Sequence, residues 1–174
     1  MNRIRIIAFD VDGTLTPGML MIGRGGEVCK DFSARDGLGL SLAHRMGYIT
    51  GLITGRASES VAYRQKELHM DFAEMNVTDK IAAMEAVREH YGVSWEEIAY
   101  MGDDLNDLAL MKKVGYSGCP ADGADEVRQA ADFLSEKNGG AGAARAFIES
   151  ILKREGRWAE AVQSYLTGLQ PAGQ

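Results

Sequence analysis

Acidic side chains follow the first apolar segment of the chain at a spacing that suits metal-assisted chemistry. Asp10 and Asp12 come directly after the apolar run IRIIAF, residues 4–9, and Gly13 lets the chain turn there. A further acid, Asp103, follows another apolar run. Crowded carboxylates repel one another unless a cation neutralises them, and Mg²⁺ prefers oxygen ligands. The pattern therefore predicts a magnesium site built from Asp10, Asp12 and Asp103.

A hydroxyl and a positive charge farther along the chain indicate that this site handles phosphate. Thr54-Gly55-Arg56 offers a hydroxyl and backbone N–H groups ahead of a helical pattern, which is a good place for phosphate oxygens. Lys80 begins another helical pattern and adds a positive charge. Phosphoryl transfer depends mainly on positioning and charge neutralisation. We therefore predict that Asp10 is a carboxylate nucleophile assisted by Thr54 and Lys80.

These residues lie where buried strands are expected to end. Apolar runs predict strands at 4–9, 48–53, 98–101 and 115–119. Helical patterns lie between and after them, at 37–46, 58–68, 79–91, 105–112, 123–130 and 142–153. Alternating strands and helices predict a doubly wound, mainly parallel α/β sheet of the Rossmann-like kind. Ligands bind such sheets outside the carboxyl ends of the strands, which is where Asp10, Asp12, Thr54, Asp103 and Asp104 are expected.

One segment breaks this alternation. Residues 19–22 and 27–32 read as two strands around a glycine turn at 23–26. We expect a β-hairpin that projects from the sheet within 18–33. Its apolar residues favour a contact with another subunit, and the alternative is that the hairpin packs on its own core.

Length and composition are those of one compact domain. The chain has 174 residues, 45% of them hydrophobic and 25% charged, so we expect a single domain over 1–174 that ends in a helix and tail at 157–174. The net charge of −6 without a basic run argues against nucleic-acid and anionic-membrane partners. The first apolar run is too short for a signal sequence or membrane span, so we expect a cytoplasmic protein.

The ordered motifs resemble those of the haloacid-dehalogenase superfamily. The four motifs of that superfamily are matched in order by D-V-D-G-T (10–14), I-T-G-R (53–56), Lys80 and G-D-D-L-N-D (102–107). The resemblance implies the superfamily's core fold and a phosphatase that works through an aspartyl-phosphate intermediate.

The same resemblance implies a role for each acid. Asp10 would attack phosphorus, and Asp12 would protonate the leaving oxygen and then activate water. Asp103 would hold Mg²⁺ together with Asp10 and the carbonyl of Asp12, and Asp104 and Asp107 would support the metal site.

Most members of the superfamily carry a cap domain after the first or the second motif. Asp10 and Thr54 are 54 − 10 = 44 positions apart, which the hairpin and one helix fill, and Lys80 follows after only 26 more. We therefore predict a capless member, in which a neighbouring subunit completes the pocket around a small substrate.

The chain more closely resembles the tetrameric 3-deoxy-D-manno-octulosonate 8-phosphate phosphatases and their nonulosonate 9-phosphate relatives. The resemblance rests on K-D-F-S-A-R-D-G-L-G-L (30–40), S-x-x-V-A-Y-R (58–64) and G-G-A-G-A-A-R (139–145). It implies a homotetramer with shared active sites, a small phosphate ester as substrate and a role in lipopolysaccharide biosynthesis. The implied substrate-binding residues are Ser33, Ala34, Arg35, Asp36, Gly37, Gly55, Arg56, Arg64 and Lys80.

Arginines suit such a substrate because a guanidinium binds a carboxylate through two parallel hydrogen bonds. Arg35, Arg56 and Arg64 are the candidates, and for each the alternative is a solvated arginine on a helix or turn. Ser41 stands where octulosonate-specific members usually have a basic residue. The choice between an octulosonate and a nonulosonate phosphate therefore stays open.

Three other interpretations compete with a phosphatase. A response-regulator receiver has its acidic pair at the first strand and its lysine last, whereas here Lys80 precedes Asp103-Asp104. A phosphomutase normally needs a mobile cap. A catalytically dead interaction domain finds no support because every motif residue is present. We predict a Mg²⁺-dependent phosphomonoesterase acting on a phosphorylated keto sugar acid.

Overall fold

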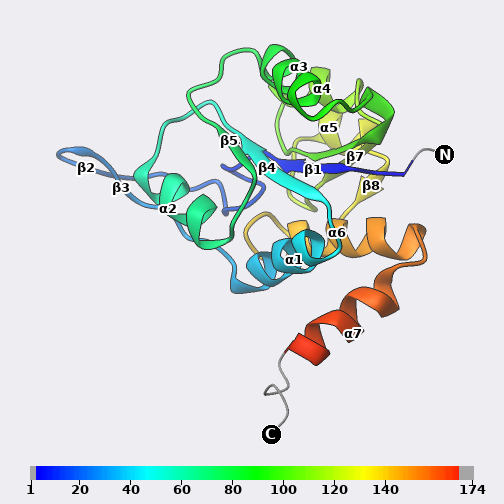
Figure 1. Ribbon diagram of the computed structural model, residues 1–174. Coiled ribbons are helices and arrows are strands. Elements are labelled where there is room, and N and C mark those ends of the chain that lie inside the picture. Colours follow the sequence, from blue (N-terminus) through cyan, green and yellow to red (C-terminus); the bar gives the residue numbers. More distant parts are fainter. Residues whose placement is uncertain (1–2, 169–174) are drawn as a thin grey trace, which may run out of the picture.

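A parallel sheet of six strands forms the centre of the protein, in a computed structural model that describes residues 3–168 (Figure 1). The strands are β1 (Ile6–Phe9), β4 (Ile49–Ile53), β5 (Phe72–Glu74), β6 (Ile98–Met101), β7 (Tyr116–Cys119) and β8 (Phe133–Leu134). Their order is β5-β4-β1-β6-β7-β8, so the chain builds outward from β1 first on one side and then on the other. This is the predicted doubly wound topology, whose switch point lies at β1.

Helices cover both faces of the sheet (Figure 1). On one face lie α1 (Ala34–Arg45) and α6 (Ala143–Arg154), and α7 (Trp158–Gly168) packs on both and extends away from the sheet. On the other face lie α3 (Lys80–Tyr91), α4 (Leu108–Met111) and α5 (Asp125–Ala130), while α2 (Glu59–Glu67) follows β4 near the β5 edge. Among the described residues, the segments after β1 and β4 hold no cap domain, as predicted.

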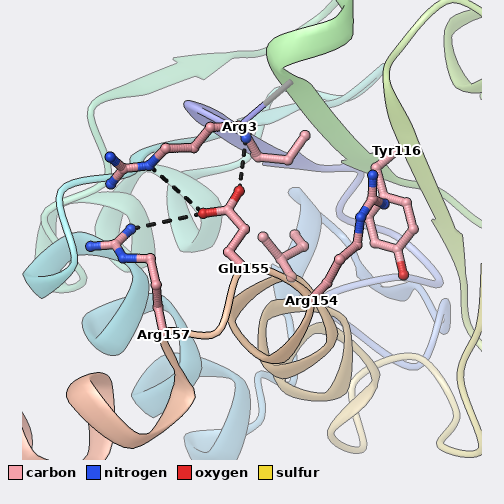
Figure 2. A pocket seen from close by; sticks show the side chains of 7 residues that line it. Arg3, Tyr116, Arg154, Glu155 and Arg157 are labelled. Carbon is pink, nitrogen blue, oxygen red and sulfur yellow. Dashed lines mark hydrogen bonds and ion pairs between the residues drawn. The ribbon is translucent and has the colours of Figure 1, made fainter. Parts of the chain in front are cut away.

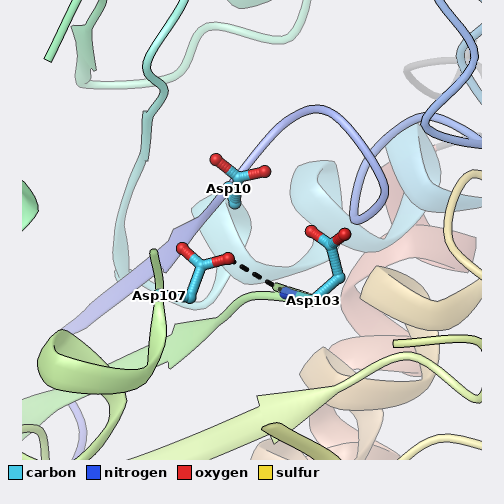
Figure 3. Close-up of side chains that lie close together, drawn as sticks. All are labelled: Asp10, Asp103 and Asp107. Carbon is cyan, nitrogen blue, oxygen red and sulfur yellow. Dashed lines mark hydrogen bonds between the residues drawn. The ribbon is translucent and has the colours of Figure 1, made fainter. Parts of the chain in front are cut away.

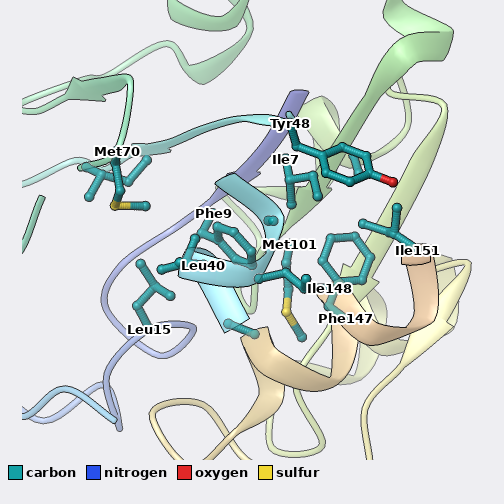
Figure 4. Close-up of a cluster of buried hydrophobic side chains, with 14 of the residues drawn as sticks. Ile7, Phe9, Leu15, Leu40, Tyr48, Met70, Met101, Phe147, Ile148 and Ile151 are labelled. Atoms are coloured by element: carbon teal, nitrogen blue, oxygen red, sulfur yellow. The ribbon is translucent and has the colours of Figure 1, made fainter. Parts of the chain in front are cut away.

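The core divides into two clusters because successive strand residues point to opposite faces. Ile7 and Phe9 of β1 face α1 and α6, where Phe147 packs edge-on against Phe9 at a ring-centroid distance of 6.2 Å (Figure 4). Ile6 and Ala8 face the cluster under α3, α4 and α5. A strand buried on both faces reads as the continuous apolar run seen in the sequence.

The predicted hairpin is present and projects from the body of the protein (Figure 1). Its strands β2 (Met21–Gly23) and β3 (Gly26–Cys29) are antiparallel and mostly exposed. The second strand was expected to run to residue 32 but ends at Cys29. The next residue, Lys30, leaves the ladder and places its ammonium group against two half-buried acids, Asp12 and Glu27.

Several element boundaries differ from those expected. The edge strands β5 and β8 were not predicted, because runs of three and two residues are too short to show a period. Helix α1 begins at Ala34 rather than at residue 37, because the Oγ of Ser33 accepts a hydrogen bond from the backbone N–H of Asp36 at 3.4 Å. The helix expected at 105–112 is shortened to α4.

A half-buried glutamate ties three segments together at the amino ends of the strands (Figure 2). Glu155 accepts hydrogen bonds from the backbone N–H of Ile4 at 2.8 Å and from the hydroxyl of Tyr48 at 2.7 Å. Burial and this carboxylate raise the pKa of Tyr48 to about 12. Arg3 and Arg157 lie 3.7 and 4.0 Å from the same carboxylate, beside a hollow of about 470 Å³.

We expect Glu155→Ala to lower the free energy of unfolding by about 2–4 kcal/mol, because it leaves two donors without their acceptor. Urea unfolding checks this. Glu160→Ala is the matched control, since Glu160 pairs with Arg157 at 3.5 Å but is 66% exposed, and exposed pairs contribute about 0–1 kcal/mol. Equal effects of the two substitutions would contradict the assignment.

No helix within residues 3–168 combines the length and the apolar character that crossing a bilayer requires.

Candidate active site

The predicted site residues meet at the carboxyl ends of the central strands. Asp10 follows β1, Thr54 follows β4, and Asp103 lies two residues beyond β6. Strand β1 pairs in parallel with both neighbours, so Phe9 lies opposite Leu52 and Met101. The three strands therefore end at one level, at the edge of the sheet opposite to the hollow beside Glu155.

Three carboxylates converge at this edge (Figure 3). One oxygen from each of Asp10, Asp103 and Asp107 lies within 4.8 Å of the others. Burial and the charge of Asp107 raise the pKa of Asp10 to about 6, although Lys80 opposes this. Burial and the charge of Asp10 raise the pKa of Asp103 to about 7. The charged forms of these carboxyl groups are therefore unfavourable on their own, and a divalent cation between them would stabilise those forms.

Asp107 holds the residues around the three-acid cluster in place. Its Oδ2 accepts the backbone N–H groups of Asp103 at 3.0 Å and Asp104 at 3.3 Å, and its Oδ1 accepts the Tyr100 hydroxyl at 2.6 Å. Both oxygens also lie in a fully buried position. Asp107 thus fixes the loop that carries Asp103, and its backbone contacts explain why α4 starts late. That Asp10 and Asp103 bind the metal stays a prediction.

Lys80 lies between two of these acids. Its Nζ donates to Asp10 Oδ1 at 2.5 Å and to Asp107 Oδ1 at 2.6 Å. Burial lowers the pKa of Lys80, but the two carboxylates outweigh burial and raise it. Asp79 caps α3 by accepting the backbone N–H of Ala82 at 3.0 Å, which fixes the start of the helix and hence Lys80. Lys80 is therefore a fixed positive charge beside Asp10.

The carboxylate of Asp12 does not join the three-acid cluster. It contacts the ammonium group of Lys30, and its Oδ2 lies 4.0 Å from Nε of Arg56. The sequence placed this carboxylate with the metal ligands, and the structure puts Asp107 there instead. A metal contact through the Asp12 carbonyl stays a prediction. Nothing in the sequence spacing pointed to Lys30, because a single lysine after a strand carries no signal.

Two glycines shape the loop that carries Asp12. Gly13 has φ +95°, and a Cβ there would lie 2.0 Å from Oδ2 of Asp103. Gly139, far along the chain, packs so closely that a Cβ would lie 1.8 Å from the carbonyl oxygen of Gly13. Thr14 completes the loop by donating its hydroxyl to Asp103 Oδ1 at 2.9 Å. The loop is thus held from both sides.

The segment predicted to bind phosphate follows β4 as expected. Thr54 is buried, and its Oγ1 accepts the backbone N–H of Arg56 at 3.4 Å. Gly55 and Arg56 are exposed beside it. This arrangement leaves the arginine side chain accessible at the mouth of the site, next to Asp12.

The predicted substrate residues at the start of α1, together with Arg64 of α2, divide into two groups. Ser33, Asp36, Gly37 and Arg64 line one small hollow, with Arg64 Nη2 donating to the Ser33 carbonyl at 3.1 Å. Ala34 and Arg35 are exposed on the first turn of α1. Substrate contacts by these residues stay predictions.

Asp36 already has structural partners. Its carboxylate accepts the backbone N–H groups of Gly142 at 3.2 Å and Arg145 at 2.7 Å, at the start of α6. Burial raises the pKa of Asp36, although these backbone contacts oppose the rise. The observed contacts explain Asp36 through the packing of α1 against α6.

We expect the affinity for Mg²⁺ to increase as the pH rises through 6 to 7. Below the raised pKa values of about 6 for Asp10 and about 7 for Asp103, protons compete with the cation for the same oxygens. Each displaced proton changes the affinity roughly tenfold per pH unit. Isothermal titration calorimetry from pH 5.5 to 8 measures this, and Asp103→Asn should flatten the dependence. A pH-independent affinity would refute the metal assignment.

The chain belongs to the haloacid dehalogenase-like hydrolase family, whose model matches residues 58–147. It is also similar over nearly its whole length to 3-deoxy-D-manno-octulosonate 8-phosphate phosphatase KdsC of Escherichia coli. The two are 34% identical over 160 residues, which cover 92% of this chain and 85% of that protein. The KdsC protein of Salmonella typhi shows the same identity and coverage. The resemblance predicted from the motifs is therefore confirmed.

Solved structures agree with this assignment. The Moraxella catarrhalis 3-deoxy-D-manno-octulosonate 8-phosphate phosphatase, solved with magnesium, phosphate and KDO, is 33% identical with a TM-score of 0.89, covering 93% of each chain. The cobalt-bound Haemophilus influenzae phosphatase is 31% identical with a TM-score of 0.89, covering 94% of this chain and 97% of that one. The match over nearly the full length confirms the capless haloacid-dehalogenase fold.

Proposed function

We propose that the protein is a Mg²⁺-dependent phosphomonoesterase that hydrolyses 3-deoxy-D-manno-octulosonate 8-phosphate. The observation that carries this is the position of Lys80, 2.5 Å from Asp10 and 2.6 Å from Asp107, at a strand edge that also holds Asp103. A carboxylate nucleophile, a fixed positive charge and a metal-binding acid are the parts that phosphoryl transfer needs. The near full-length similarity to phosphatases of this substrate supports the choice of ester.

Asp10 and Asp103, with the Asp12 carbonyl, would hold Mg²⁺. The raised pKa values of the two acids support this fit, because a cation would stabilise the charged forms that burial disfavours. When bound, the metal supplies positive charge to the phosphate oxygens. Lys80 would add a second positive charge beside Asp10.

The residues of the chain account for two chemical steps. Lys80 holds Asp10 in place through Oδ1, and a carboxylate oxygen of Asp10 forms a bond to phosphorus while the bond from phosphorus to the sugar oxygen breaks. Asp12 donates a proton to the leaving oxygen. In the second step water attacks the phosphorus of the aspartyl phosphate, Asp12 takes a proton from that water, and the Asp10 carboxylate and inorganic phosphate are released.

The hairpin supports assembly into a homotetramer with shared active sites. Within one chain its apolar residues contact little of the body, and the exposed fraction of Met19 reaches 80%. Leu20, Met21, Ile22 and Val28 are also exposed. Exposed apolar side chains gathered on one projecting element mark an interaction site. Light scattering should give four chains per particle, and an active monomer would contradict the proposal.

A substrate panel tests the reaction. Phosphate release from 3-deoxy-D-manno-octulosonate 8-phosphate should require Mg²⁺, stop with EDTA and exceed release from a nonulosonate 9-phosphate. Faster release from the nonulosonate ester would transfer the assignment to that substrate, which Ser41 supports. No metal-dependent release from any sugar-acid phosphate would overturn the proposed function. Location in the cytoplasm stays part of the proposal.

A further inference from the structure

A chain of buried and half-buried polar side chains joins the hairpin to Asp12. The ammonium group of Lys30 contacts Oδ1 of Asp12 and lies 2.9 Å from Oε2 of Glu27 in β3. The other oxygen of Glu27 accepts the hydroxyl of Ser58, which caps α2 by accepting the backbone N–H of Val61 at 3.3 Å. The hairpin and α2 are therefore tied to the loop after β1.

Lys30 is too well buried for this to be a surface ion pair. Its side chain is 2% exposed, against 21% for Asp12 and 15% for Glu27. An ammonium group that leaves water needs charged partners in good geometry, and here two carboxylates provide them. The position of Lys30 is consequently fixed, and the position of the Asp12 carboxylate is fixed with it.

The two carboxylate oxygens of Asp12 have different surroundings. Oδ1 is occupied by Lys30, whereas Oδ2 is buried without a hydrogen-bond partner among residues 3–168. Nε of Arg56 lies 4.0 Å from this oxygen. A buried oxygen left unpaired is costly and calls for an explanation. A role in proton transfer explains it, because an oxygen that gives a proton to the leaving oxygen and then takes one from water must be free of protein partners.

We propose that Lys30 is a positioning residue that holds Asp12 by Oδ1 and so presents Oδ2 to the reacting oxygen. The inference rests on the proposed function and adds a residue from the hairpin to it. Because Lys30 is anchored by Glu27 and Ser58, a displaced hairpin would also displace Asp12. Proton transfer by Asp12 therefore depends on the hairpin being packed in this position.

Lys30→Met tests this, because it keeps the length of the side chain and removes its hydrogen bonds. For an alkyl phosphate, whose leaving oxygen needs a proton, kcat/KM should fall about 10²-fold, the usual contribution of a positioned acid. For p-nitrophenyl phosphate, whose leaving group departs as an anion, kcat/KM should change less than about threefold. Equal losses on both substrates would mean a merely structural role and would overturn the proposal.

A double-mutant cycle sharpens the test. With Asp12→Asn already present, Lys30→Met should reduce kcat/KM for the alkyl phosphate no further, since the residue it positions is disabled. Additive losses would overturn the proposal. Lys112→Met, on an exposed lysine at the end of α4, is the matched control and should retain wild-type values. Failure of the wild-type protein to hydrolyse either ester would refute the proposed function itself, which is a distinguishable result.

Discussion

Asp10→Asn is expected to abolish phosphate release, with kcat lowered by at least about 10⁴-fold, because an amide cannot form the aspartyl phosphate. The substitution preserves shape but removes the nucleophile and one partner of Lys80. Phosphate release and trapping of the phosphoenzyme by mass spectrometry measure the two consequences. Activity within about tenfold of the wild type would exclude Asp10 as the nucleophile.

The same variant should not be less stable without metal. The pKa of Asp10 is raised from 3.8 to about 6 on folding. The charged carboxylate is therefore less favourable in the folded protein than in the unfolded chain. Stability is therefore highest below the unfolded pKa and is lost as the pH rises towards 6. At pH 7.5 the Asn variant avoids this cost, and its melting temperature should equal or exceed that of the wild type. A large fall in Tm would show that lost activity reflects misfolding.

Gly139→Ala should damage the active site although Gly139 lies far from Asp10 in the sequence. The new methyl group would lie 1.8 Å from the Gly13 carbonyl oxygen, so one of the two backbone segments must move. Displacing well-packed backbone costs about 1–3 kcal/mol or more. Because Gly13 separates Asp12 from Thr14, we also expect kcat/KM to fall about 10²-fold, since small misplacements at a reacting centre have effects of this size.

Gly25→Ala is the control for this substitution. Gly25 lies at the hairpin turn, where a Cβ would meet nothing within 4 Å, and its change in unfolding free energy should stay within about 0.5 kcal/mol. Thermal unfolding and kcat/KM measured on both variants separate the two effects. A Gly139→Ala protein with wild-type stability and activity would contradict the prediction, because it would show that the loop around Gly13 can move without cost.

The parts of the fold that could be predicted from the sequence are those marked by long apolar runs or by recognisable helix caps. The buried runs of β1, β4 and β6 and the capped helix at Lys80 were found because their apolar residues and caps repeat recognisable patterns. The two short edge strands have no such signal. Motif order also predicted that Asp10, Lys80 and Asp103 meet, because parallel strands must end at one edge.

The remaining site features depend on contacts between distant residues. Lys30 and Asp12 meet only because the hairpin folds back, and Asp36 caps α6 more than a hundred positions away. The carboxylate of Asp107, and not that of Asp12, lies beside Asp10 and Asp103 because backbone N–H groups of its own loop orient it. Spacing along the chain carries no information about such side-chain directions.

The central place of β1 has a consequence for how the chain is made. Ile6 pairs with Ile49 on one side and with Ile98 on the other, so the first strand synthesised waits for partners 43 and 92 residues later. Sheets that depend on such distant pairings fold slowly and expose apolar strands meanwhile. On the ribosome, the segment IIAF therefore emerges early, gains its first partner once β4 has been made, and keeps its other edge unpaired until β6 exists, when more than half of the protein has been synthesised.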